Sequence, residues 1–153
     1  MVGQPRSYSF DIEQLLQDGV AAITADGACQ VSGAAKILDL GSATANYSGI
    51  VIIDVQAIDI ANSDEEYFLL VQGSNSATFA SGVQNLACLP LADTAVAKGG
   101  AIDATVGRYE LPFVNRQDDT IYQYIRMYVD VEGTSPSIDF TAFIGQASGG
   151  IMP

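Results

Sequence analysis

The chain has 153 residues, which fits a single domain of about 100–200 residues, and its 48% apolar content excludes a disordered chain. Its 18 acidic and 6 basic residues give a net charge of −12, which argues against binding to nucleic-acid phosphates and to anionic membrane surfaces. A basic or neutral protein surface remains as a partner.

Residues 1–19 predict an N-terminal arm, in which we expect neither a secretory leader nor a membrane span. Within this arm, Ser9–Gln17 predicts one or two helical turns that Ser9 caps and Gly19 ends. The arm also carries apolar side chains that need burial, either against a partner or over one end of the chain's own domain. These interface candidates are Phe10, Ile12, Leu15 and Leu16.

From Val20 onward the pattern is that of β-structure. Segments rich in Val, Ile, Tyr, Phe and Thr alternate with turn-forming clusters of Gly, Asn, Asp, Ser and Pro. This pattern predicts an all-β domain over residues 20–146, a jelly-roll-like two-sheet antiparallel β-sandwich, followed by a C-terminal tail over 147–153. The predicted strands are Val20–Ala25, Lys36–Leu40, Gly49–Ile60, Glu66–Gln72, Gln84–Leu91, Ala104–Phe113, Thr120–Glu132 and Ser137–Gly145.

The hydrophobic phase changes part-way along Gly49–Ile60. Apolar residues stand at odd positions up to Val55 and at even positions from Ile58 onward. One extra residue near Ala57 and Ile58 restores a single buried face, which predicts a β-bulge at this point.

The Thr120–Glu132 segment alternates so that its odd positions, from Ile125 to Val131, predict the core face. The even positions carry tyrosine and arginine, which are enriched at the centres of protein interfaces. Either this face is an interface, or it is an ordinary exposed strand on which the arginine neutralises a nearby carboxylate. The interface candidates on it are Tyr122, Tyr124, Arg126 and Tyr128.

In Ser137–Gly145 the same alternation places Phe143 on the outer face, and we add it to the interface candidates. If this strand and the preceding one form a hairpin, Arg126 lies across from Phe143 and Asp130 lies across from Asp139. The predicted core face of this last strand is Ile138, Phe140, Ala142 and Ile144.

Histidine is absent, which removes the commonest general base and the commonest metal ligand. Cys29 and Cys88 lack metal-ligand spacing and predict either two reduced, buried thiols or one disulfide. The acidic runs Asp64–Glu66 and Asp118–Asp119 either bind a hard cation such as Ca²⁺ or are solvated turn carboxylates, and neither matches an EF-hand loop. We therefore predict no catalytic residues, no metal, no cofactor and no small-molecule substrate.

Several strand-and-turn segments, in this order and spacing, resemble the jelly-roll capsid cement (decoration) proteins of tailed bacteriophages. The similarity spans residues 36–145 and does not cover 1–19 or 147–153. The segments that carry it are Ile37–Gly41, Val71–Gly82, Arg108–Phe113 and Tyr124–Pro136.

The resemblance implies a structural virion protein without enzymatic activity, made in the host bacterial cytoplasm and placed on the outer capsid surface. Such a protein binds the major capsid protein, bridges capsomers and stabilises the shell. A homo-oligomer is expected, either a dimer or a trimer, because both symmetries reuse one exposed strand face. The alternatives are a carbohydrate-binding or tail-fibre β-sandwich module and, third, a cation-dependent hydrolase.

Overall fold

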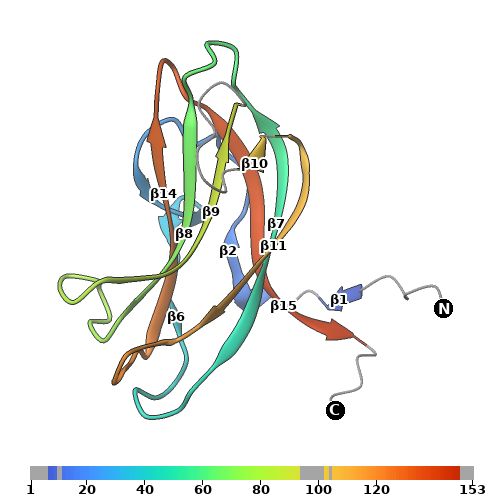
Figure 1. Cartoon of the computed structure of the whole chain (residues 1–153). Helices are drawn as coiled ribbons and strands as arrows, with labels where there is room; N and C mark the ends of the chain where they lie inside the picture. The colour runs from blue at the N-terminus through green and yellow to red at the C-terminus, as the bar shows by residue number, and fades with distance from the viewer. Residues whose placement is uncertain (1–6, 10–11, 94–101, 104, 149–153) are drawn as a thin grey trace.

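The computed structural model describes residues 7–9, 12–93, 102–103 and 105–148, and it shows two β-sheets packed face to face (Figure 1). The predicted all-β sandwich is confirmed. Its elements in chain order are β1 (Ser7–Ser9), the 3₁₀ turn η1 (Ile12–Gln14), β2 (Leu15–Gln17), β3 (Gly27–Ala28), β4 (Gln30–Val31), β5 (Ala34–Ala35), β6 (Leu38–Asp39), β7 (Ser48–Ile58), β8 (Glu66–Ser74), β9 (Gln84–Ala92), β10 (Ile102–Asp103), β11 (Gly107–Val114), β12 (Arg116–Gln117), β13 (Thr120–Ile121), β14 (Tyr124–Glu132) and β15 (Ile138–Ser148).

One sheet has the order β1-β15-β7-β11, with β2 also pairing with β15. The other has the order β10-β9-β8-β14-β3, with β6 also pairing with β14. Among the described strands all pairings are antiparallel except the short parallel pair of β9 and β10. Strands β14 and β15 therefore lie in opposite sheets, and the predicted hairpin pairing of Arg126 with Phe143 and of Asp130 with Asp139 is wrong.

The core lies between the two sheets and follows the period-two alternation of the long strands. On β14, Ile125, Met127 and Val129 are fully buried, as predicted. The predicted core face of β15 is equally buried, and β8 adds a third row. Those residues are Ile138, Phe140, Ala142 and Ile144 on β15, and Tyr67, Leu69 and Val71 on β8.

The bulge predicted in β7 is present. Against β15, Asp139 pairs with Ala57 and the next residue, Phe140, pairs with Val55, so Gln56 is the extra residue. This position is one residue earlier than the predicted one. The bulge returns Ile58 to the core side of the sheet, where it packs against the buried cluster.

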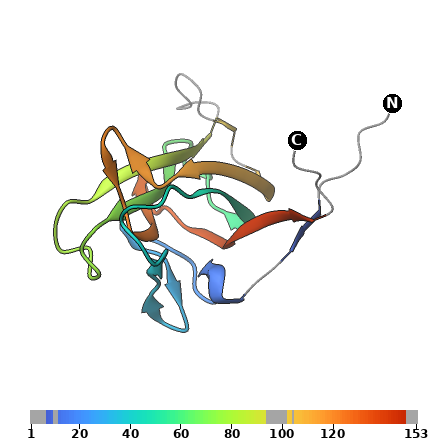
Figure 2. The same ribbon diagram turned by 90° about the horizontal axis from the view of Figure 1, so that it is seen from below.

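Of the one or two helical turns predicted over Ser9–Gln17, the described residues form the single 3₁₀ turn η1, and Ser9 and Leu15–Gln17 belong to strands β1 and β2 instead. Strand β2 is stabilised by pairing with β15, whereas a short helix without tertiary contacts is marginal in water. Residue Leu16 is fully buried in the domain's own core and is no longer an interface candidate. Strand β2 also contacts β4 of the small β4–β5 hairpin, which lies at one edge of the sandwich (Figure 2).

Three other predicted strands differ in extent. Most of Val20–Ala25 is irregular, with a single bridge between Ile23 and Ile138. The predicted Lys36–Leu40 shortens to β6. The predicted Thr120–Glu132 is interrupted at residues 122–123, between β13 and β14.

Candidate protein-interaction surface

The candidate site is the side of the six-stranded sheet that points away from the core, which we call the outer face. It is built from alternate residues of β8, β9 and β14, because neighbouring side chains of a strand point to opposite sides of the sheet. The register aligns these residues in rows that run across the three strands. Its members are Phe68, Leu70, Gln72, Cys88, Pro90, Tyr124, Arg126, Tyr128 and Asp130.

The centre of the outer face is apolar. Leu70 is paired with Tyr128 on one side and with Cys88 on the other, and in the next row Phe68 is paired with Pro90. Cys88 is exposed and the other four are half-buried. An antiparallel sheet with one side in water normally carries polar residues there. This sheet instead carries partly exposed apolar side chains at the centre of its outer face.

Sequence reasoning missed Phe68 and Leu70 because it predicted the strand Glu66–Gln72 without assigning its two sides. The signal was present: Tyr67–Val71 is an unbroken apolar run, whereas a strand with one side in water alternates. The structure buries the odd residues of this run in the core and places the even ones on the outer face.

At one end of the outer face, Arg126 holds the loop between β8 and β9 onto the sheet. Its Nε donates to Gln72 Oε1 at 2.9 Å, and Gln72 Nε2 donates to Asn85 Oδ1 at 2.9 Å. The guanidinium carbon lies 4.4 Å from the ring centroid of Phe79 and 5.3 Å from that of Tyr128. Arg126 thus contacts two rings of its own sheet face and neither neutralises Asp130 nor meets Phe143.

Phe79 was not predicted because nothing in a polar loop marks one residue for burial. The loop folds back so that Phe79 is 7% exposed, with a backbone φ of +56°. The turn is closed by the hydrogen bond from Phe79 N to Ser76 O at 3.0 Å and by the bond from Ser74 Oγ to Ser81 O at 2.8 Å. The ring then covers the Arg126 guanidinium, a cation–π contact.

The opposite end of the outer face is acidic. Asp26 adjoins Asp130 here, and Asp26 Oδ1 accepts from the backbone N of Val131 at 2.8 Å. Burial raises the pKa of Asp130, and the charges of Asp26 and Glu132 raise it further. Glu132 is paired directly with Glu66, so two more carboxylates face each other in the last row.

The remaining predicted interface residues fall into two groups. Tyr124, Arg126 and Tyr128 lie on the outer face and are partly exposed. Tyr122 and Phe143 are 9% and 7% exposed, so their placement on an outer surface was wrong.

Different causes bury Tyr122 and Phe143. The break before β14 turns Tyr122 inward, where it packs directly on Gly73. The approach is so close that a Cβ on Gly73 would lie 2.9 Å from the Tyr122 Cβ. Phe143 belongs to the other sheet, between Leu15 of β2 and Ile52 of β7. In the arm, Ile12 is 67% exposed and Leu15 is half-buried, and Phe10 lies outside the described residues.

The acidic turn Asp64–Glu66 serves internal hydrogen bonds. Glu65 is fully buried, and its carboxylate accepts from Asn62 N, Asn62 Nδ2 and Asp64 N at 3.0–3.3 Å. Asp64 accepts from the backbone N and the hydroxyl of Thr134, which lowers its pKa. Within the described residues no three His, Cys, Asp or Glu side chains gather to hold a metal ion.

The second acidic turn is a surface feature. Asp118 and Asp119 are both exposed, and an Asp119 carboxylate oxygen lies 3.8 Å from Arg116 Nη2. An exposed pair at this distance contributes little to stability.

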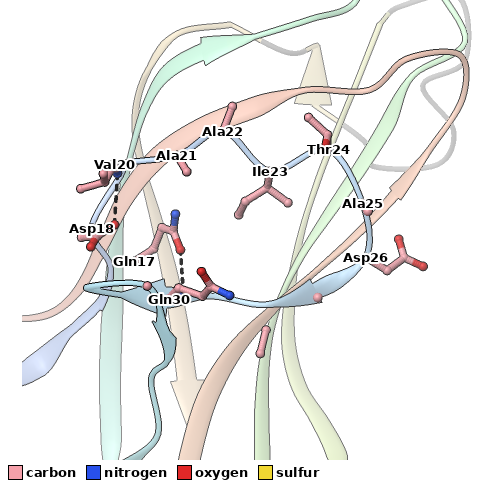
Figure 3. Close-up of a pocket in the computed structure, with 13 residues that line it drawn as sticks. Gln17, Asp18, Val20, Ala21, Ala22, Ile23, Thr24, Ala25, Asp26 and Gln30 are labelled. Atoms are coloured by element: carbon pink, nitrogen blue, oxygen red, sulfur yellow. Dashed lines mark hydrogen bonds between the residues drawn. The ribbon is translucent and has the colours of Figure 1, made fainter.

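A hollow of about 280 Å³ lies beneath the arch formed by residues 18–26 (Figure 3). The polar groups around it are bound within the arch: Asp18 Oδ1 accepts from Val20 N at 3.1 Å, and Gln17 Oε1 accepts from Gln30 N at 2.8 Å. Of the six labelled residues between Asp18 and Asp26, only Thr24 has a polar side chain. This composition lacks the convergent polar groups that orient a small ligand.

Both cysteines are free thiols. Cys29 is 1% exposed, and burial raises its pKa to about 12. The predicted burial of Cys88 is wrong, because the alternation of β9 sends Leu89 and Leu91 to the core and Cys88 to the outer face. The outer face therefore carries an accessible thiol.

Comparison of the chain with protein-family models, with curated proteins and with solved structures gave no match. In the part of the chain that the structure describes, no helix has the length and apolar character needed to cross a membrane.

Proposed function

We propose that this protein is a structural virion protein, a capsid cement or decoration protein that binds the major capsid protein on the outer capsid surface and bridges capsomers. The observation that carries this proposal is the apolar and aromatic outer face on a rigid two-sheet sandwich. The strand-and-turn resemblance described above supplies the assignment to phage capsids.

A cement protein acts by mass action. A protein that binds only the assembled shell lowers the free energy of that state and leaves the dissociated subunits unchanged. This role requires a rigid scaffold and a contact surface, and it requires no catalytic group. The sandwich supplies the scaffold, and the row of Tyr128, Leu70 and Cys88 supplies a surface with apolar area to bury.

A carbohydrate-binding module is the alternative, and it would use the three tyrosines as a sugar platform. The structure favours a protein partner, because Tyr122 is buried and Tyr128 lies beside the Arg126 guanidinium. Only Tyr124 and Tyr128 of the three remain on the outer face.

The test uses particles of the phage that encodes the chain, prepared with and without this protein. Particles that lack it are expected to assemble but to release DNA at a lower temperature, and added wild-type protein should restore the release temperature. Equal release temperatures with and without bound protein would refute the proposal.

Point variants connect this test to the outer face. Leu70→Ser with Tyr128→Ser should abolish decoration while the sandwich stays folded, since neither side chain is in the core. Val114→Ser, on the other sheet and 48% exposed, is the matched control and should decorate normally. Circular dichroism verifies that all variants are folded.

A further inference from the structure

We infer that the outer face docks a segment of a foreign protein that presents an apolar side chain next to a lysine or arginine, with the cation placed between Asp26 and Asp130. This inference rests on the proposed function and specifies the chemistry of the partner surface.

The layout of the face sets the order of these two features. The apolar centre around Leu70 and Phe68 gives an apolar side chain a place to bury. In the same row as Phe68, its cross-strand partner Asp130 and the adjoining Asp26 present two carboxyl groups on the same side of the sheet, next to this apolar centre. Like charges placed opposite each other in a sheet are destabilising, so an incoming cation gains attraction and also relieves a repulsion.

Within the described residues, Asp26 and Asp130 form no ion pair with a lysine or an arginine. Arg126 is held at the far end of the face by Gln72 and the two rings. Arg108 forms a paired hydrogen bond with Asp54 on the other sheet, and Arg116 bonds the carbonyl oxygen of Asp118.

Charge complementarity favours a foreign partner over a second copy. A second copy brings another net charge of −12 and the same carboxylates. Its Arg126 is covered by Phe79 and hydrogen-bonded to Gln72, so it would have to leave these contacts to reach Asp130. A basic surface meets the acidic end without this rearrangement.

The test uses Cys88 as a reporter in the full chain. Cys88 lies in the centre of the face and is exposed, whereas Cys29 is buried with a pKa of about 12, so a thiol reagent modifies Cys88 in the native protein. Burial and the charge of Asp130 also raise the pKa of Cys88, so each rate is compared with that of the same variant without peptide. The probe is a synthetic peptide of alternating leucine and lysine, and the measured quantity is the rate of Cys88 modification against peptide concentration. A peptide of alternating serine and lysine has the same charge without the apolar side chains.

The leucine–lysine peptide is expected to slow Cys88 modification, and the serine–lysine peptide is not. Asp26→Asn with Asp130→Asn should weaken the protection about fivefold at low salt, since two exposed ion pairs are lost, and the difference should shrink at high salt. Asp118→Asn with Asp119→Asn changes the net charge equally, away from the face, and should behave as the wild type.

Three results would overturn the inference: no protection by the leucine–lysine peptide, equal weakening in both double variants, or protection that rises with protein concentration alone. The last result would show that a second copy occupies the face. The proposed function is tested separately. If particles do not bind the protein, the capsid role is refuted even if the peptide protects Cys88. Particles that bind it while the peptide fails would leave the capsid role standing without this docking chemistry.

Discussion

Replacing Asn115 by alanine should strongly destabilise the sandwich. The Asn115 side chain is fully buried between the segment that leads into β7 and the β12–β13 hairpin. Its Oδ1 accepts from Tyr47 N at 2.7 Å, and its Nδ2 donates to Ala45 O and to Tyr122 O, both at 3.0 Å. One side chain thus satisfies three backbone groups from two chain segments.

The expected cost follows from these three bonds. Each contributes about 0.5–1.5 kcal/mol net, and a partner left buried without water costs about 1–3 kcal/mol. Ala45 is exposed, so water replaces part of the loss there, whereas the bond to Tyr122 is buried. Asn115→Ala should therefore lower the free energy of unfolding by about 3 kcal/mol, which is roughly 6–12 °C in unfolding temperature for a domain of this size.

Asn115→Asp is the matched control because it keeps the shape and the acceptor for Tyr47 N. At neutral pH it points a buried carboxylate at two carbonyl oxygens, which raises the pKa of the introduced carboxyl group in the folded state. A group whose folded pKa is raised stabilises the fold while protonated, and this contribution is lost as the pH rises through that pKa. The stability deficit of Asn115→Asp should therefore shrink toward acidic pH, whereas that of Asn115→Ala should not.

Urea unfolding followed by circular dichroism measures both variants against the wild type at neutral and acidic pH. A loss below about 1 kcal/mol for Asn115→Ala would refute the reasoning, since it would mean that the three bonds are readily replaced by water. A pH-independent deficit for Asn115→Asp would show that its carboxyl group is not buried among the carbonyl oxygens.

Three further predictions concern other parts of the chain. Asp130→Asn should raise the unfolding temperature at about pH 7 and have little effect near about pH 3. The pKa of Asp130 is raised in the fold, so its ionised form, which exists only above the ordinary carboxyl pKa, destabilises the folded state. Thermal unfolding across pH checks this, and equal effects at both pH values would contradict it. Gly133→Ala should lower the free energy of unfolding in urea by ~3 kcal/mol, because φ is +100° and the new Cβ would lie 2.5 Å from a backbone oxygen. Gly82→Ala is the control for backbone strain alone, since φ is +62° there and the new Cβ meets open space. Equal losses in the two variants would contradict the clash. Arg126→Met should speed amide hydrogen exchange in the loop 75–83, and unchanged exchange would show that the loop holds its own position.

The sequence by itself determined the fold class and the core sides of three long strands, β7, β14 and β15. Alternation along a strand is a local property with a period of two. The buried side of β14, with Ile125, Met127 and Val129, can therefore be predicted before the neighbouring strands are known. The bulge at Gln56 was visible for the same reason, since an extra residue must shift the hydrophobic phase. On the candidate face, the alternation also placed Tyr124, Arg126 and Tyr128 correctly.

Only the tertiary structure decided which strands share a sheet and what covers each outer side. Backbone hydrogen bonds between strands are almost independent of side-chain identity, so adjacency along the chain could not show that β14 and β15 lie in opposite sheets. Long-range packing then buried Phe143 and brought Phe79 from a polar loop onto Arg126. These contacts join residues far apart in the sequence, and no local pattern encodes them.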